Sequence, residues 1–239
     1  MAPWPGRLEG GLLPWRGRVH QMRKNHGSHS IHGLVFDTAW EIETSVADSI
    51  SLHRNLDDLW PLGGEIRHRI ALTPNGMKFS LEARAGESGM PWAAGWHPWF
   101  ERAGEDIRLT VQSEATLVTT DDLIPLGEVA MVGEERDLRS GPLVGERRLD
   151  HAYVGARSPA IVRWSDLELH LEFGPPIETL VVYTPEGAAC VEPQSAWPNA
   201  AGLAARGVVR TGLAALEPNE RSRLEMRWSW RVFDPSPRG

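Results

Sequence analysis

The sequence predicts an all-β fold, most simply a large sandwich of antiparallel sheets. Hydrophobic residues alternate with polar ones from one end of the chain to the other, a pattern that is typical of half-buried strands. The 24 glycines and 18 prolines imply many turns between such strands. Helical periodicity is weak, and the chain shows no βαβ rhythm and no internal repeat.

Five stretches carry this alternation along the chain. Hydrophobic residues, with His68 among them, occupy every second position in 66–72, 79–83, 107–111, 167–173 and 224–232. The sequence Pro74-Asn75-Gly76 marks a turn between the first two stretches. A helical turn or two is expected only near 55–60 and 200–205. We expect residues 1–233 to form a single domain and 234–239 to be a disordered tail.

The composition narrows the possible partners. The chain has 239 residues, of which 41% are hydrophobic and 24% charged, so it can bury a sizeable core and is not expected to be disordered. A net charge of -7 and a pI of about 5.7 argue against nucleic acid and anionic membranes as main partners. No Walker loop, dinucleotide-binding glycine pattern or zinc-type cysteine set is present.

The sequence also favours a cytoplasmic location. Cys190 is the only cysteine, so no internal disulfide can form, which fits a reducing compartment. No apolar run approaches the length of a membrane span. The N-terminal segment MAPWPGRLEGG lacks the order of charged, apolar and small residues found in a signal peptide.

Two histidines and a glutamate stand beside turn-forming residues in the strings SIHGLV, GWHPWF and CVEPQS. They are His32, His97 and Glu192. Histidine and glutamate are the side chains most used for proton transfer near neutral pH. A fold that brings the three together would place a general base and a general acid against one small substrate.

His97 is held in a restricted setting. Pro98 disfavours helical backbone at His97, and the flanking Trp96 and Trp99 limit its hydration. The alternative is a buried histidine bonded to a backbone carbonyl, and the residues alone do not separate the two interpretations. A hydrogen-bonding role for His32 in its loop competes with a purely structural role in the same way.

Glu192 ends an apolar stretch, where a carboxylate loses hydration unless it is paired. Desolvation would raise its pKa and make it a better base near neutral pH, although a salt bridge is an equal alternative. Glu186, in a Pro-Glu-Gly turn, is expected to be solvated. Cys190 lies two residues before Glu192 and is expected to pack on the same face rather than act as a nucleophile.

Three weaker candidates remain. Arg7, in PWPGR, offers a forked set of donors suited to hydroxyls or a ring oxygen. Asp150, in RRLDHAY, could accept hydrogen bonds from hydroxyls, although the residues alone favour a surface charge cluster. The spacing of His26, His29 and His32 suggests a metal site, but on a strand the middle histidine points away from the other two, so no metal is expected.

Taken together, these strings resemble the aldose 1-epimerase (galactose mutarotase-like) family. The likeness comprises PWPGR at 3–7, SIHGLV at 30–35 continued by FDTAW at 36–40, GWHPWF at 95–100, LDHAY at 149–153 and VEP at 191–193. Each motif is weak by itself. Five motifs in the family's order, spread over most of the chain, are strongly specific.

The resemblance implies a large mutarotase-type β-sandwich, or supersandwich, with a concave face that binds one monosaccharide. It assigns Glu192 as general base and His97 as general acid, with His32 near the ring oxygen and Arg7 and Asp150 holding the sugar. It implies an isomerase that needs no metal or organic cofactor, and it leaves open whether the protein is a monomer or a homodimer.

There is one departure from the family pattern. The PWPNR-type segment of the family follows one or more strands, but here it starts at residue 3, with Gly6 in place of the frequent Asn. We therefore expect the fold to lack those strands and to expose a sheet edge. The alternatives are a hexose-phosphate 1-epimerase, with a phosphate pocket from Arg16, Arg18, Arg23 and Lys24 or from Arg147 and Arg148, and a non-catalytic sugar-binding protein.

Overall fold

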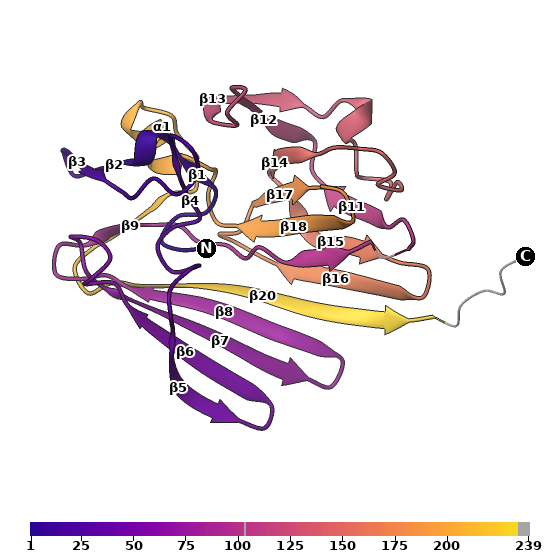
Figure 1. The fold of residues 1–239 in the computed structure, drawn as a ribbon, viewed down its shortest axis with the longest axis horizontal. Coiled ribbons are helices and arrows are strands. Elements are labelled where there is room, and N and C mark those ends of the chain that lie inside the picture. Colours follow the sequence, from indigo (N-terminus) through magenta and orange to yellow (C-terminus); the bar gives the residue numbers. More distant parts are fainter. Residues whose placement is uncertain (103, 234–239) are drawn as a thin grey trace, which may run out of the picture.

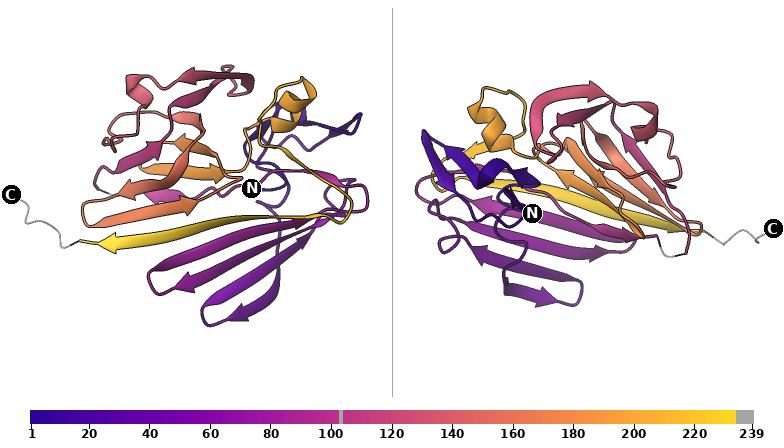
Figure 2. Two further views of the ribbon diagram at one scale, coloured as in Figure 1. Left: turned by 180° about the vertical axis from the view of Figure 1, so that it is seen from behind. Right: turned by 45° about the horizontal axis from the view of Figure 1, so that its top comes forward.

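The computed structural model describes residues 1–102 and 104–233. Two large sheets dominate it, and all strand pairs within its sheets are antiparallel, which confirms the predicted all-β class. In the three views, the smaller sheet lies over one half of the larger one, and the other half extends beyond it (Figures 1 and 2). The predicted tail, 234–239, lies outside the described residues.

The larger sheet has eight strands, and their spatial order brings distant parts of the chain together. That order is β11 (Arg108–Gln112), β15 (Arg157–Arg163), β16 (Leu167–Phe173), β20 (Arg221–Val232), β8 (Gly76–Arg84), β7 (Glu65–Thr73), β6 (Ser49–Asn55) and β5 (Glu41–Val46). The long strand β20 joins the two halves, because it pairs with β16 on one side and β8 on the other. Every residue of the edge strand β5 is exposed.

The smaller sheet has six strands. Their order is β10 (Trp99–Glu101), β18 (Ala188–Gln194), β17 (Thr179–Tyr183), β14 (Asp150–Val154), β12 (Ala115–Thr119) and β13 (Pro125–Met131). Three two-stranded pairs complete the sheet structure, namely β1 (Arg7–Leu8) with β4 (Ser30–Ile31), β2 (Leu12–Trp15) with β3 (Arg18–Gln21), and β9 (Met90–Trp92) with β19 (Ala214–Leu216).

The helical content is small. Among the described residues it consists of α1 (Ala200–Ala205) and two 3-10 turns, Glu9–Gly11 and Glu134–Arg136. The expectation for 200–205 is therefore confirmed. Residues 55–60 instead form hydrogen-bonded turns without a helix, in which the backbone N–H groups of Leu59 and Trp60 both donate to the carbonyl of Leu56. No helix in the described part of the chain is long and apolar enough to cross a membrane.

The core lies between the two sheets. Its buried side chains come from the larger sheet, such as Leu109, Val162 and Leu171, and from the smaller one, such as Leu180 and Val191. In the predicted stretch 167–173, the alternation of hydrophobic and polar residues places the side chains of Leu169 and Leu171 in this core. The five predicted stretches lie within strands β7, β8, β11, β16 and β20, except that the stretch 107–111 begins one residue before β11.

The segment before β5 is tied to the rest of the fold by close backbone approaches. Gly33 has a φ of +78°, and a Cβ at this position would lie 2.0 Å from the carbonyl oxygen of Ala2. That oxygen accepts a hydrogen bond of 2.7 Å from the Leu34 N–H. This close approach to Ala2 is possible only because Gly33 has no side chain, and it fixes the position of the preceding residue, His32.

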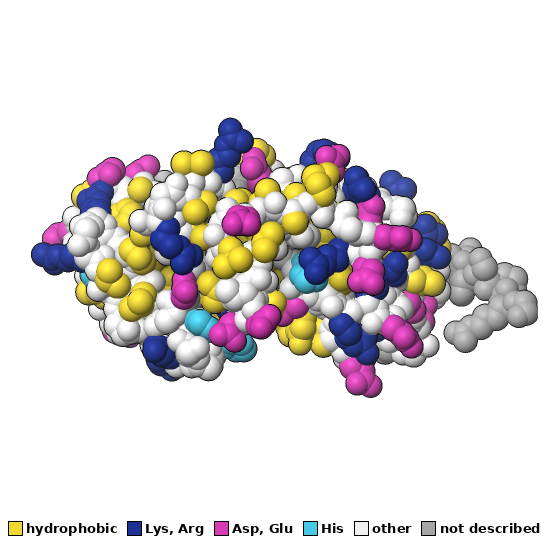
Figure 3. Space-filling model, turned by 90° about the horizontal axis from the view of Figure 1, so that it is seen from above, with side chains coloured by type: hydrophobic (Ala, Val, Ile, Leu, Met, Phe, Trp, Pro, Cys, Tyr) yellow, Lys and Arg dark blue, Asp and Glu magenta, His cyan; other side chains and the backbone are white. Residues whose placement is uncertain are grey.

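The face seen from above carries charged side chains of both signs interspersed with hydrophobic ones (Figure 3). No area of Lys and Arg alone stands out on this face.

Substituting Gly33 by alanine should destabilise the fold strongly. Gly27→Ala is the matched control, because Gly27 also has a positive φ (+57°) but a Cβ there meets no atom within 4 Å. We expect Gly27→Ala to cost about 1–2 kcal/mol and Gly33→Ala about 3 kcal/mol or more in denaturant unfolding. Equal costs for the two variants would contradict this account of Gly33.

Candidate functional site

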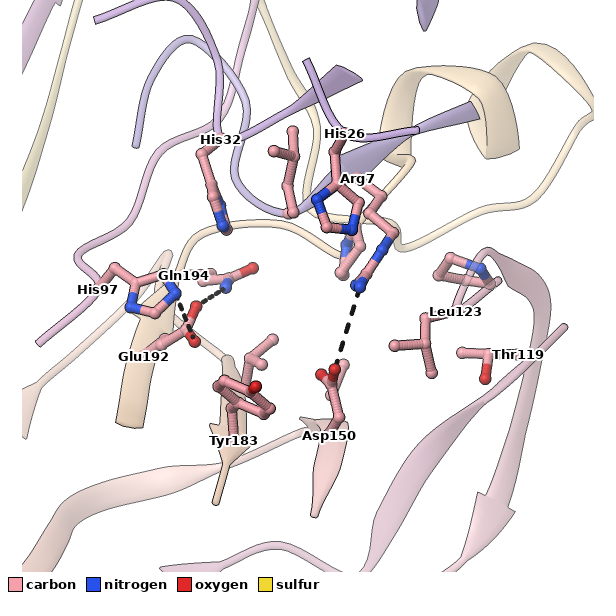
Figure 4. Close-up of a pocket in the computed structure, with 16 residues that line it drawn as sticks. Arg7, His26, His32, His97, Thr119, Leu123, Asp150, Tyr183, Glu192 and Gln194 are labelled. Carbon is pink, nitrogen blue, oxygen red and sulfur yellow. Dashed lines mark hydrogen bonds and ion pairs between the residues drawn. The ribbon is translucent and has the colours of Figure 1, made fainter. Parts of the chain in front are cut away.

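A cavity of about 270 Å³ opens between the smaller sheet and the N-terminal segment. All five residues predicted from the sequence line it (Figure 4), namely Arg7, His32, His97, Asp150 and Glu192. The other lining residues are Gly6, His26, Ile31, Thr119, Leu123, Pro125, Ala152, Val181, Tyr183, Gln194 and Pro198. The fold thus brings together residues that are separated by up to 185 positions in the sequence.

The side chains of β17 and β18 alternate between the core and the cavity, and those on the cavity side form its floor. On β17, Leu180 and Val182 are buried in the core, whereas Val181 and Tyr183 line the cavity. On β18, Val191 is in the core and Glu192 lines the cavity. The same strands that complete the sandwich core therefore present a second, functional face.

Glu192 and His97 are in direct contact. The Oε1 atom of Glu192 lies 3.2 Å from Nε2 of His97. Strand β10 sets this approach, because Trp99 pairs with Cys190 of β18 in the sheet register and His97 lies two residues before Trp99. The amide of Gln194 donates a 3.2 Å hydrogen bond to Glu192 Oε2.

Burial shifts the proton affinities of this pair in opposite directions. Glu192 is only 2% exposed, and desolvation, reinforced by the nearby carboxylate of Asp150, raises its pKa to about 8. Desolvation lowers the pKa of His97 below its ordinary value. At neutral pH the pair consequently holds one proton on Glu192, and the contact is a hydrogen bond between a neutral carboxyl and a neutral imidazole rather than an ion pair.

Aromatic neighbours hold the ring of His97 in place. Trp99 stacks on it, with ring centroids 5.3 Å apart and an angle of 18° between the planes. His32 meets it edge-on, with centroids 5.0 Å apart. Burial, followed by the charge of His97, lowers the pKa of His32 to about 3, so His32 is a neutral hydrogen-bonding group at neutral pH.

Arg7 and Asp150 lie on the other side of the cavity from His97 (Figure 4). The guanidinium Nη2 of Arg7 is 4.0 Å from Asp150 Oδ2. Desolvation raises the pKa of Asp150, and the positive charge of Arg7 opposes this shift. Arg7 is anchored through β1, which pairs with β4, and through its carbonyl, which accepts a 2.7 Å hydrogen bond from the Asn199 N–H.

Gly6 has a physical reason to replace the asparagine that is frequent in this motif. Its φ is +62°, and a Cβ on it would lie 2.8 Å from the Cβ of Pro198. The Pro198 ring thus packs where a larger side chain would project. The carbonyl of Gly6 also accepts a 2.9 Å hydrogen bond from the His32 N–H, which links Arg7 and His32 structurally.

The histidine run is divided between two environments. His26 and His32 line the cavity, whereas His29 accepts a hydrogen bond from the Gly10 N–H through Nδ1. Within the described residues, the group of three side chains that could hold a metal ion is a different one, formed by His97, Cys190 and Glu192, whose ligand atoms lie within 4.8 Å of one another. Burial raises the pKa of the Cys190 thiol, so it is protonated at neutral pH.

Several cavity residues are not marked by any motif. Gln194 is one of them, although its position two residues after Glu192 on a strand places both on one face and could have indicated it. Thr119, Leu123 and Tyr183 carry no such signal, because their contribution depends on sheet order and on one hairpin loop. Glu186 is exposed, as its turn sequence predicts.

Comparisons with known proteins agree with the motifs. The family model described as Aldose 1-epimerase matches residues 1–229. The uncharacterised Escherichia coli K12 protein YphB is 21% identical over 247 residues, which covers 95% of this chain and 81% of YphB.

Solved structures show the same fold. A galactose mutarotase-like protein from Clostridium acetobutylicum has a TM-score of 0.85 at 16% identity, and the match covers 96% of this chain and 78% of that protein's chain. A GalM/aldose epimerase homologue from C. elegans has a TM-score of 0.83 at 18% identity, covering 98% and 82%.

The buried carboxyl of Glu192 should make stability depend on pH. Its pKa is about 4.5 when unfolded and about 8 when folded, so the folded state binds more protons between these values and loses stability as pH rises through them. Glu192→Gln removes the ionisation and should stabilise the protein at pH 8.5 by roughly 2–4 kcal/mol, with little effect at pH 5. Thermal unfolding at both pH values checks this, and an equal effect at the two would contradict it.

Proposed function

Since the chain belongs to the aldose 1-epimerase family, we propose that it interconverts the α and β anomers of a free aldose monosaccharide. The observation that carries the proposal is the 3.2 Å contact between Glu192 and His97 at the wall of a cavity of about 270 Å³. It supplies one proton acceptor and one proton donor to a single small molecule. The proposed mechanism uses only side chains.

Ring opening needs two proton transfers. The shared proton first passes from Glu192 to His97 across their contact. Glu192 then removes the proton from the anomeric hydroxyl, and His97 gives its proton to the ring oxygen as the bond between this oxygen and C1 breaks. The sugar becomes an open-chain aldehyde. Rotation about the C1–C2 bond presents the other face of the carbonyl, and the reverse transfers close the ring as the other anomer. Each positioned acid or base contributes on the order of 10²–10⁴-fold.

The environment of the pair favours the protonation state that follows ring opening. After ring opening, Glu192 is protonated and His97 is neutral. Burial promotes this same distribution, because it raises the pKa of Glu192 and lowers that of His97. It is also the resting distribution, so ring opening returns the pair to the state that burial stabilises.

The remaining polar groups support binding of a sugar. Arg7 and Asp150 offer a donor and an acceptor to ring hydroxyls, and neutral His32 lies beside His97 for the ring oxygen. Ala152 and Val181 provide an apolar floor for the carbon face of the ring.

The charges favour a free sugar over a sugar phosphate. Arg7 is the single Lys or Arg among the described residues that line the cavity, and it already faces Asp150. Arg16 is paired with Glu217 at 2.6 Å, and Arg23 with Asp37 at 2.5 Å. Arg147 donates to the carbonyls of Glu135 and Leu143.

Polarimetry of freshly dissolved α-D-glucose and α-D-galactose tests the proposal. We expect the protein to speed the decay to the same final rotation as in buffer. Binding of these sugars without faster exchange would instead identify a sugar-binding protein. Competition by inorganic phosphate would favour a phosphorylated substrate.

Removing either member of the pair should abolish most of the activity. We expect Glu192→Gln and His97→Asn each to lower kcat by roughly 10²–10⁴-fold, with circular dichroism unchanged. Glu186→Gln is the matched control, because Glu186 is an exposed carboxylate in the turn before β18. Near wild-type turnover in Glu192→Gln would refute the assignment.

Activity should fall at alkaline pH. The pair needs one shared proton, which is lost as pH rises through about 8, the pKa of Glu192. A second proton is added only at a pH below the ordinary range of histidine, because burial lowers the pKa of His97. We expect kcat/KM, corrected for spontaneous mutarotation, to be flat near neutrality and to decline above pH 8. A steady rise from pH 7 to 9 would contradict the shared-proton mechanism.

A further inference from the structure

Gln194 is a buried amide beside the pair of Glu192 and His97. Its side chain is 0% exposed, and it stands two residues after Glu192 on β18, so both side chains lie on the cavity face of the smaller sheet. Its Nε2 donates to Oε2 of Glu192 at 3.2 Å (Figure 4). Among the described residues its Oε1 has no hydrogen-bond partner, so the bond to Glu192 is the one that this amide makes.

The sheet holds Gln194 on both sides of its strand. Its backbone pairs with Thr179 of β17 on one side and forms a bridge with Gly95 on the other. A Cβ at Gly95 would lie 2.9 Å from Cγ of Gln194, so the absence of a side chain at Gly95 leaves room for the stem of the amide. The position of the amide next to Glu192 is therefore set by the fold.

Keeping an amide in this place has a cost. A buried polar side chain with an unpartnered oxygen loses hydration that its single hydrogen bond restores only in part. A methionine or leucine of similar size would avoid this cost. The presence of glutamine instead indicates that its one hydrogen bond, to Glu192, has a function.

The two oxygens of Glu192 have different partners. Oε1 lies 3.2 Å from Nε2 of His97, whereas Oε2 accepts the hydrogen bond from Gln194. Burial raises the pKa of Glu192 to about 8, so its carboxyl is neutral at pH 7 and has one hydroxyl and one carbonyl oxygen. The carbonyl oxygen is the better acceptor for an N–H group. The amide therefore favours Oε2 as the carbonyl oxygen and Oε1, next to His97, as the oxygen that carries the proton.

We propose that Gln194 is a positioning residue whose amide keeps the shared proton on Oε1 of Glu192, so that every proton transfer runs through this one oxygen. This inference rests on the proposed anomer exchange. The anomeric hydroxyl and the ring oxygen are both bonded to C1, so the groups that serve them must be neighbours, as Oε1 and His97 Nε2 are. Oε1 passes its proton to Nε2 and then takes the proton of the anomeric hydroxyl, while His97 protonates the ring oxygen. Oε2 stays bound to Gln194 throughout.

The same hydrogen bond affects the acidity of Glu192 in a direction that can be measured. It lowers the pKa of Glu192, against the larger effect of burial, because an N–H donor stabilises a carboxylate more than a neutral carboxyl. Loss of the donor should therefore raise this pKa further. A role in packing alone would give no such rise.

Gln194→Met tests the proposal, because methionine keeps an unbranched side chain of similar length and lacks the donor. In the polarimetric assay we expect kcat to fall by roughly 10- to 100-fold, and the alkaline decline of kcat/KM to move upward by roughly 0.5–1 on the pH scale. Unchanged turnover, or a loss of turnover with the alkaline decline in its original place, would overturn the proposal.

Thr179→Val is the matched control. Thr179 is a buried polar residue, 3% exposed, that lies opposite Gln194 on β17 and does not line the cavity. This variant should keep the turnover and the pH profile of the wild type. An upward move of the alkaline decline in Thr179→Val as large as that in Gln194→Met would overturn the assignment to the amide of Gln194.

Carbon-13 NMR of the glutamate carboxyl groups measures the pKa of Glu192 without any sugar, with Glu192→Gln to assign its signal. A higher pKa in Gln194→Met than in the wild type would support the proposal, and an equal or lower one would overturn it. Gln194→Leu takes the place of Gln194→Met if that variant does not fold, and failure of both to fold would identify Gln194 as a structural residue and overturn the proposal.

Failure of the proposed function would be seen separately. If neither glucose nor galactose exchanges anomers faster than in buffer, the epimerase proposal fails. The NMR titration then still decides the inference about Gln194, because it reports on the contact between the amide and Glu192 and needs no turnover.

Discussion

The burial of one carboxyl group is the constraint on which the site depends. Glu192 is placed in the second strand of a six-stranded sheet, where burial strips its carboxyl of water. Such a group must be protonated or paired, and both solutions are present in the contacts with His97 and Gln194. The raised proton affinity that results is what a proton-transfer catalyst needs near neutral pH.

The smaller sheet makes this burial possible because the two faces of its strands have different roles. One face completes the sandwich core, and the other forms the floor of the cavity. Stability and chemistry are therefore coupled through shared backbone. A change in strand register by one residue would exchange the two faces and move Glu192 into the core.

The walls of the cavity are formed by segments that have little regular structure. They are held by positions where a side chain is excluded or the backbone is strained, notably Gly6 against Pro198, Gly33 against Ala2, and Leu123 in its hairpin. These contacts position Arg7, His32 and the far end of the cavity. Loops that are fixed in this way can differ in the side chains they present while the contact between Glu192 and His97 stays unchanged.

The sequence by itself determined the fold class and identified five candidate site residues that line one cavity. Alternating hydrophobicity is a local property, so strands such as Leu167–Phe173 and Arg221–Val232 could be predicted from it. The motifs around His97 and Glu192 could be identified because a proline, a glycine or an apolar run beside a titratable group is also a local feature of the sequence. The helical expectation for 55–60 was wrong because short turns and helices share the same local pattern.

Only the tertiary structure decided which of these residues meet and in which protonation state. Strand order is non-local, so no string in the sequence indicates that Asp150 of β14 and Glu192 of β18 share a floor with Tyr183 between them. The pKa of a carboxyl depends on how much water the whole fold removes from it, which no pair of neighbouring residues reveals. Leu123 enters the cavity for the same reason, through a loop geometry that long-range packing enforces.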